Sequence, residues 1–356
     1  METNTLTDVL THSGPFATVL VEVSQDTEHG EHERETRVRD AVRQLVDHGA
    51  PPTVTDAVRE RLDEVVRRPA PVARMVVGTA EGIVYDDVAA TRVEQPVASW
   101  QPLPDLALWV AHRDASLPFV VVLVDHEGGE ISLWDSDVPE AELQIEAGGE
   151  VAFVHKPKGA AYVRVDHSSE NVWRHNADAV AEEVTRLVRA HGHPLVLVGG
   201  DPHSVSLLRR DLDSLPSEVV ELPTGQRTAD GGDAALQDAI REALGTHVAT
   251  KRLDLAHRLR DALGRGEGAA TGVHDVAEAF VQGRVETLLV DPAKAAELDL
   301  DPSDHPGLTW GSAGVDGPVR ADEALIAAAI ATDAEVSILP SAVLGGAPVA
   351  ALLRWA

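Results

Sequence analysis

Two of the four lysines in this chain lie in one short loop, Lys156 and Lys158, with Gly159 directly after them. The loop separates two stretches whose β-branched and aromatic residues predict strands, residues 150–154 and 161–165. Ammonium groups can meet phosphates as compact point charges, so this spacing is compatible with a protruding nucleic-acid contact. An ordinary hairpin loop with solubilising lysines is the alternative, and the loop alone does not decide between the two.

A second candidate follows the predicted strand 194–198, where Gly199, Gly200 and Asp201 lead into a predicted helix. Backbone amides at such a turn can hold a phosphate group. Neither Gly-x-Gly-x-x-Gly nor Gly-Lys-Ser/Thr follows, so we expect a plain turn in which Asp201 caps the helix. The glycine-rich residues 264–268 are not preceded by a predicted strand, which argues against a dinucleotide-binding loop.

Metal and hydrolase chemistry are weakly indicated. His29, Glu31 and His32 could ligate a divalent ion, but they lack the paired histidines of a His-Glu-x-x-His helix, and we expect an exposed polar loop. Residues 311–314, Gly-Ser-Ala-Gly, do not match the Gly-x-Ser-x-Gly motif of serine hydrolases. The absence of cysteine excludes disulfides, thiolate catalysis and cysteine-based zinc sites. We therefore assign no catalytic residue, no metal site and no cofactor.

The chain of 356 residues is strongly acidic, with a formal net charge of -29. A charge of this size repels nucleic acid at long range. Salt reduces the range of the repulsion to about 10 Å, so a local basic loop can still dock on nucleic acid. A GC-rich or salt-adapted genome explains the acidity equally well. No apolar run approaches the length of a membrane span, and the acidic, polar start at Met1 does not resemble a signal peptide. We expect a cytoplasmic protein without a membrane partner.

Hydrophobic spacing predicts helices and strands along the whole chain. Segments with strand character are 16–23, 75–77, 82–85, 119–124, 130–134, 150–154, 161–165, 194–198, 218–222, 285–290 and 335–339. Segments with helical character are 38–46, 56–66, 103–112, 173–190, 203–212, 234–263, 272–282 and 322–332. This order predicts an α/β fold of three domains, an N-terminal α/β domain (1–115), a mixed-sheet middle domain (116–265) and a small α/β/α sandwich (266–356).

From about residue 117 onward, the order of these elements resembles the archaeal and eukaryotic class-1 release factor and Pelota superfamily. In that superfamily the middle domain opens with a strand, an Asp-x-x-Gly turn and a second strand, matched here by Asp125 to Gly128. An Arg/Glu-containing stretch then leads to a long helix with His-Asn near its start. Arg164, Glu170 and residues 173–176, Trp-Arg-His-Asn, are similar to this part of the pattern.

The third domain of the superfamily begins with a glycine, a short helix with a Val-x-x-Ala core, a second glycine and a Val-x-x-Leu-Leu strand. The matching residues here are Gly272, Val276, Ala279, Gly283, Val285, Leu288 and Leu289. Gly345, Gly346 and Arg354 are similar to the Gly-Gly and Leu-Arg of the superfamily's C-terminal ending. The first domain, with Gly-Pro-Phe at 14–16, looks like the actinobacterial branch that includes the hibernation factor Balon.

The loop described first departs from the superfamily pattern. Where release factors carry Gly-Gly-Gln, this chain has Lys-Gly-Ala-Ala at 158–161. Hydrolysis of peptidyl-tRNA needs a glycine-permitted backbone there, which brings water and the ester together. The resemblance therefore implies a non-catalytic protein that occupies the ribosomal A site in hibernation or stress protection, with an elongation-factor GTPase as a possible partner. The expected RNA contacts are His155, Lys156, Lys158, Gly159 and Arg164.

Two alternatives stay open. A peptidyl-tRNA hydrolase or rescue factor would use a different residue, and His155, His167 and Glu170 are then the candidates for the general base. A protein-binding or small-molecule-binding module that never meets a ribosome would also fit the net charge. Salt separates these classes, because binding driven by phosphates weakens steeply as salt rises.

Overall fold

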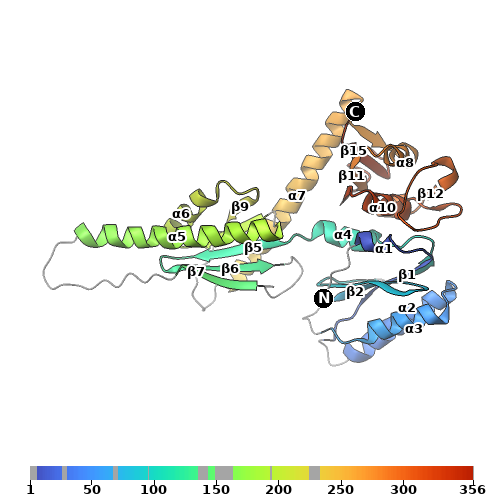
Figure 1. The fold of residues 1–356 in the computed structure, drawn as a ribbon, viewed down its shortest axis with the longest axis horizontal. Helices are drawn as coiled ribbons and strands as arrows, with labels where there is room; N and C mark the ends of the chain where they lie inside the picture. The colour runs from blue at the N-terminus through green and yellow to red at the C-terminus, as the bar shows by residue number, and fades with distance from the viewer. Residues whose placement is uncertain are drawn as a thin grey trace. The chain divides into compact units, whose positions relative to one another are not determined.

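The computed structural model (Figure 1) describes residues 6–25, 30–66, 71–94, 96–134, 143–148, 163–192, 195–223 and 233–355. By its contacts the chain forms two compact units. The first unit combines Met1–Ala115 with Lys251–Ala356, and the second unit is Ser116–Thr250. Both units contain helices and sheets, which confirms the predicted α/β class. The predicted division into three domains, with boundaries at residues 115 and 265, stays a prediction.

The N-terminal part of the first unit is an antiparallel sheet in the order β3-β2-β1-β4. Its elements are α1 (Leu6–Val9), β1 (Phe16–Glu22), α2 (Gly30–Asp47), α3 (Pro52–Asp63), β2 (Ala73–Thr79), β3 (Gly82–Ala89), β4 (Val97–Gln101) and α4 (Ala107–Ala115). Successive side chains of a strand point to opposite faces of the sheet. On β1, Val19 and Val21 accordingly pack in one core with α2 and α3, whereas Phe16 and Leu20 belong to a different core.

The C-terminal part of the first unit is a mixed sheet in the order β10-β15-β11-β14. Its elements include β10 (Ala269–Thr271), α8 (Val273–Val281), β11 (Val285–Val290), α9 (Pro292–Ala295), β12 (Asp299–Leu300), β13 (Val319–Arg320), α10 (Ala321–Ala331), β14 (Glu335–Ile338) and β15 (Val349–Leu353). Leu288 of β11 packs in a core with α8 and α10. Its neighbour Leu289 packs with Leu255 and Leu259 of α7 (Asp233–Arg265). Helices lie on both faces, as expected of an α/β/α sandwich, but the helix on one face, α7, lies before residue 266, where this domain was predicted to begin.

One continuous hydrophobic core joins the two parts of the first unit. Phe16, Met75 and Trp109 from the N-terminal part belong to the same buried cluster as Phe280 and Leu325 from the C-terminal part. Within this unit α4 packs against β14 and α10, and α1 packs against α10. Sequence periodicity alone gave no sign that segments so far apart in the chain share a core.

The second unit is built on a five-stranded sheet in the order β7-β6-β5-β8-β9. Its strands are β5 (Phe119–Val124), β6 (Gly128–Trp134), β7 (Leu143–Gly148), β8 (Leu195–Gly200) and β9 (Glu218–Glu221). β5 pairs antiparallel with β6 and parallel with β8, and β8 pairs parallel with β9. The mixed sheet predicted for this segment is therefore confirmed.

Helices cover both faces of this sheet. Val120 and Val122 of β5 pack in a core with α5 (Val163–His191) and α6 (Pro202–Leu212), which lie side by side over one face (Figure 1). Phe119 and Val121 pack on the other face with the first turns of α7. The uninterrupted apolar sequence of β5 follows from this burial on both sides.

Three local predictions are wrong. Residues 143–148 were expected to belong to an acidic connection, but they form the edge strand β7, in which Leu143, Ile145 and Ala147 alternate with polar residues. Residues 163–165 were expected in a strand because two valines alternate there, but they begin α5. Residues 31 and 32 were expected in an exposed loop; they are exposed, but they lie in the first turn of α2. His29 lies outside the described residues.

Candidate functional site

The predicted RNA-contacting loop falls mostly outside the described chain. His155, Lys156, Lys158 and Gly159 lie outside the described residues. Arg164 lies in the first turn of α5. The lysine-containing segment therefore precedes, in the sequence, the helix that packs on the sheet of the second unit, and its contacts with RNA stay a prediction.

The two middle-segment motifs that carry the resemblance meet at one edge of this sheet. β5 and β8 run parallel, and Val124 pairs with Gly200 where both strands end. The turn at residues 125–128 follows β5, and Trp173 and Asn176 lie on α5. Asn176 is 1% exposed, and its Nδ2 donates to the backbone carbonyl of His126 at 3.2 Å. The two motifs therefore form one structural site.

The turn after β5 is held by its own aspartate. The Oδ1 of Asp125 accepts hydrogen bonds from the backbone N–H of Glu127 at 2.8 Å and of Gly128 at 3.1 Å. The backbone N–H of Asp125 donates to the carbonyl of Gly128 at 2.9 Å. Aspartate is favoured in such turns because its side chain satisfies backbone amides two and three residues ahead.

The turn after β8 is held in a related way. Asp201 precedes α6, and its Oδ1 accepts from the backbone N–H of His203 at 3.1 Å and of Ser204 at 3.0 Å. The backbone hydrogen bond from Ser204 is the largest of the effects that lower the pKa of Asp201. Because the carboxylate occupies the amides that a phosphate would need, the predicted helix cap is confirmed and a phosphate-binding turn is disfavoured.

Three rings gather at this edge, and we call them the histidine–tryptophan patch: His126, Trp173 and His203. The ring of Trp173 lies 6.0 Å from that of His126 and 5.7 Å from that of His203, both in edge-to-face orientation. His126 and His203 are exposed and Trp173 is half-buried. The patch therefore offers aromatic and hydrogen-bonding surface from three separate elements, at the edge where β5 and β8 end.

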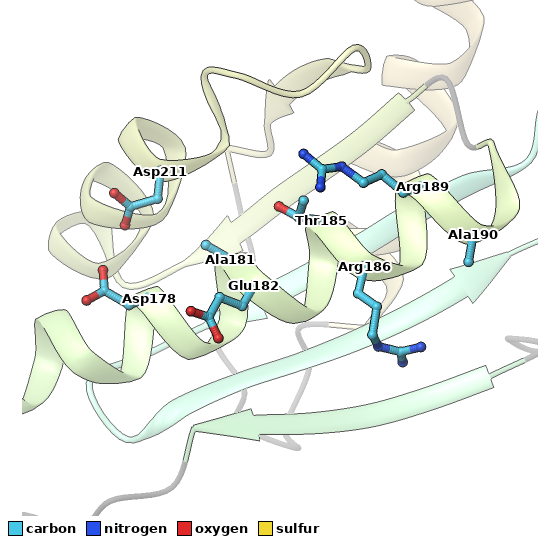
Figure 2. A pocket seen from close by; sticks show the side chains of 8 residues that line it. All are labelled: Asp178, Ala181, Glu182, Thr185, Arg186, Arg189, Ala190 and Asp211. Atoms are coloured by element: carbon cyan, nitrogen blue, oxygen red, sulfur yellow. The ribbon is translucent and has the colours of Figure 1, made fainter.

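A groove of about 840 Å³ lies between α5 and α6, and Figure 2 shows the side chains that line it. The lining residues are Asp178, Ala181, Glu182, Thr185, Arg186, Arg189, Ala190 and Asp211. In Figure 2 the carboxyl groups gather toward one end of the groove, whereas the guanidinium groups lie further along α5. The charge of the groove is therefore divided between a negative end and a positive end.

The negative end holds two carboxyl groups that interact directly. Burial raises the pKa of Asp211, and the charge of Asp178 and a hydrogen bond with it raise the pKa further. The guanidinium groups of Arg210 and Arg174 oppose this rise. At the positive end Arg186 is neutralised by Glu183, to which its Nε donates at 2.9 Å.

Among the residues that the structure describes, no group of three or more His, Asp or Glu side chains is placed to hold a metal ion. Over the same residues, no helix combines the length and the apolar character that crossing a bilayer requires.

Residues 118–265 match the family model described as bacterial archaeo-eukaryotic release factor family 2. The matched segment spans the five-stranded sheet, the histidine–tryptophan patch and α7. Over this middle segment the chain is similar to bacterial members of the release factor superfamily, which supports the superfamily predicted from the sequence.

Other relatives match over more of the chain. The uncharacterized proteins MT2704 and Rv2629 of Mycobacterium tuberculosis are each 29% identical over 364 residues, covering 96% of this chain and 94% of the relative. Ribosome-bound archaeal Pelota and ABCE1 shows 16% identity and a TM-score of 0.42, covering 100% of this chain and 95% of that chain. Dom34 of S. cerevisiae shows 10% identity and a TM-score of 0.42, covering 80% and 79% of the two chains.

Sequence patterns revealed only part of this site. The turn at residues 125–128 and the cap at Asp201 were predicted from local sequence, because each depends on residues next to it in the chain. The contact of His203 with Trp173 was missed, since the two residues lie on different helices. The predicted helix start at His203, directly after a predicted strand end, was the one available signal that this side chain would reach the same edge.

Proposed function

We propose that this protein binds the ribosome as a non-catalytic member of the release factor and Pelota superfamily. It occupies the A site, with the lysine-containing loop directed toward the peptidyl-transferase centre, and it acts in ribosome hibernation or stress protection. An elongation-factor GTPase is the expected partner, and the cytoplasm is the expected location. Placement in the actinobacterial branch, close to Balon, belongs to the same proposal.

The observation that carries the proposal is the match of residues 118–265 to a release factor family. That match includes the loop of Lys156 and Lys158 and the helix that follows it. The same loop carries Lys-Gly-Ala-Ala at 158–161 in place of Gly-Gly-Gln, which favours contact without hydrolysis. Although the net charge of the chain is -29, the two neighbouring ammonium groups give this segment a local positive charge to which phosphates can bind.

Ribosome co-sedimentation from growing and starved cells tests the proposal. We expect the wild-type chain in the ribosomal fractions of starved cells, and its affinity for purified ribosomes should fall as salt rises. The double variant Lys156→Glu/Lys158→Glu should bind more weakly, and its log–log salt slope should be smaller by about 1.4 to 1.8, which corresponds to two lost phosphate contacts.

The other two lysines provide a matched control. Lys251 and Lys294 are both exposed, so the variant Lys251→Glu/Lys294→Glu changes net charge and composition by the same amount. We expect this control to bind like the wild type. Equal weakening in both double variants would assign the effect to overall charge, and recovery of the wild-type chain only in light fractions would refute ribosome binding.

The rival function is peptidyl-tRNA hydrolysis, which the release factor match also permits. Incubation with purified stalled ribosomal complexes distinguishes the two functions through the amount of peptide released. The proposed non-catalytic role predicts binding without release above the uncatalysed background. Release by the wild-type chain that is lost in the variants His155→Ala, His167→Ala or Glu170→Gln would replace it with the hydrolase function.

A further inference from the structure

A group of charged and polar side chains, two of them buried, lies where the N-terminal and C-terminal parts of the first unit meet. The C-terminal part supplies Arg320, which precedes α10, together with Asp322 and Glu323 from the first turn of that helix. The N-terminal part supplies Gln101 from the end of β4 and Asp105 from the segment before α4. We call these five residues the junction cluster.

Arg320 is the centre of the junction cluster. Its Nε donates to Oδ1 of Asp322 at 3.1 Å and its Nη2 donates to Oδ2 at 2.6 Å, a paired contact. Its Nη1 lies 3.2 Å from Oδ2 of Asp105 and 3.0 Å from Oε1 of Glu323. The Nε2 of Gln101 also donates to Oε1 of Glu323, at 2.6 Å. Two hydrogen bonds of this cluster therefore cross from one part of the unit to the other.

The charges of the junction cluster do not balance. The side chains of Asp105, Asp322 and Glu323 are 12%, 0% and 3% exposed, and the one guanidinium group can neutralise only one of them. An uncompensated buried carboxylate is strongly disfavoured, so one of the three is expected to keep a proton instead. Burial raises the pKa of Glu323 to about 8; Arg320 opposes this rise, and the charges of Asp105 and Asp322 add to it.

We propose that the junction cluster is a proton-dependent latch between the two parts of the first unit. Glu323 binds a proton when the parts are joined and releases it when they separate. While Glu323 holds this proton, Gln101 donates to the carbonyl oxygen of its neutral carboxylic acid, and two carboxylates remain to interact with Arg320. Acidification tightens the latch and alkaline conditions loosen it.

The direction follows from proton linkage. In the separated state Glu323 returns toward its ordinary pKa of 4.5, whereas in the joined state its pKa lies near 8. The joined state therefore binds more protons between these two values, and its stabilisation is fully present below the lower value and lost as the pH rises through the upper one. For a single proton the equilibrium between joined and separated states changes by up to about tenfold per pH unit in this window.

Two backbone amides report directly on the junction. The N–H of Ser312 donates to the carbonyl of Leu10 at 2.7 Å, and the N–H of Ile338 donates to Oδ2 of Asp114 at 3.0 Å. Both bonds cross from the C-terminal part to the N-terminal part. Hydrogen exchange of these amides in the full chain, divided by the exchange rate of unstructured peptides at each pH, gives the opening equilibrium of the junction.

In the wild type we expect the protection of both amides to fall between pH 6 and pH 8.5, by up to about tenfold per unit. The variant Glu323→Gln imitates the protonated acid, so its protection should change little over this range. Glu335→Gln alters an exposed glutamate of the same C-terminal part and should keep the wild-type slope. Equal slopes in the wild type and in Glu323→Gln would overturn the proposal, and so would the absence of any slope in the wild type.

A direct titration covers the case in which Glu323→Gln does not fold. The chemical shift of a glutamate carboxyl carbon changes when the carboxyl group ionises. The signal of Glu323 is identified as the one that is missing in the variant Glu323→Asp. A carboxyl that titrates near pH 8 supports the latch. A Glu323 carboxyl that titrates near pH 4.5 shows that the group is ionised in the joined state, which the proposal does not allow.

Discussion

Replacing Gly200 with alanine should destabilise the second unit far more than the same change at Gly192. Gly200 ends β8 with a φ of +129°, and a Cβ built there would lie 1.9 Å from the carbonyl oxygen of Val124. The backbone cannot easily move away, because Gly200 pairs with Val124 in the sheet and the N–H of Asp201 donates to that same oxygen at 2.9 Å. Gly192 has a φ of +68°, but a Cβ there would meet nothing within 4 Å.

The two positions separate backbone strain from steric overlap. A left-handed conformation costs a non-glycine residue about 1–2 kcal/mol, and the reduced freedom of the unfolded chain returns about 0.4–1 kcal/mol of it. Gly192→Ala should therefore destabilise by at most about 1.6 kcal/mol. Gly200→Ala adds an overlap of the kind that costs about 1–3 kcal/mol or more in packed cores, which brings its total to about 1–5 kcal/mol.

Hydrogen exchange of strand amides in the second unit is the suitable assay, since a chain of two units need not unfold in one step. The N–H of Leu222, which donates to the carbonyl of Val198 at 2.8 Å, is one reporter beside β8. Gly200→Ala should lower its protection at least about fivefold more than Gly192→Ala does, because the overlap adds at least about 1 kcal/mol. If the protection factors of this amide in the two variants differ by less than threefold, the steric argument is refuted.

Two further substitutions test other buried contacts. Asn176→Ala removes the donor to the carbonyl of His126, which should destabilise the second unit by about 1–3 kcal/mol. The same hydrogen-exchange experiment measures this change. A destabilisation below about 0.5 kcal/mol would mean that this hydrogen bond does not hold the histidine–tryptophan patch together. Trp310→Phe removes an Nε1 donor that lies 2.8 Å from the carbonyl of Ala324, so the thermal midpoint of the first unit should fall. The control Trp355→Phe changes a side chain that is 53% exposed and should leave the midpoint nearly unchanged. Equal shifts of the midpoint in the two variants would contradict a stabilising role for the Trp310 hydrogen bond.

The helices and strands that were predicted correctly depend mostly on residues that lie close together in the sequence. The hairpin of β5 and β6 was recognisable because apolar strands flank a turn that begins with Asp125, and the turn forms through that side chain. β7 was missed although Leu143, Ile145 and Ala147 alternate with Gln144 and Glu146, because this alternation covers only five residues within an acidic stretch. The start of α5 was misjudged because Val163 and Val165 alternate over too few residues to outweigh a helix that continues through them.

Long-range contacts account for the rest. Phe16 and Trp109 were predicted to lie in an N-terminal domain of their own, and nothing in their neighbourhood shows that they share a core with Leu325. The junction cluster was hidden for the same reason, since Arg320 and Asp105 lie more than 200 residues apart in the chain. Within the candidate site, each turn could be predicted from its own aspartate, but their meeting with Trp173 could not.

The shared core of the first unit also has a consequence for how the protein is made. During synthesis, the apolar residues that the N-terminal part contributes to this core, Phe16 and Leu20 among them, are made long before α10 exists to complete the core. About 200 further residues must be added, which takes about 10–40 s at 5–20 residues per second. Throughout that interval the nascent chain exposes an apolar surface while the whole second unit emerges and folds. We therefore expect chaperone contact with the N-terminal sheet to end only after α10 has left the ribosome, which ribosome profiling of chaperone-bound nascent chains can measure.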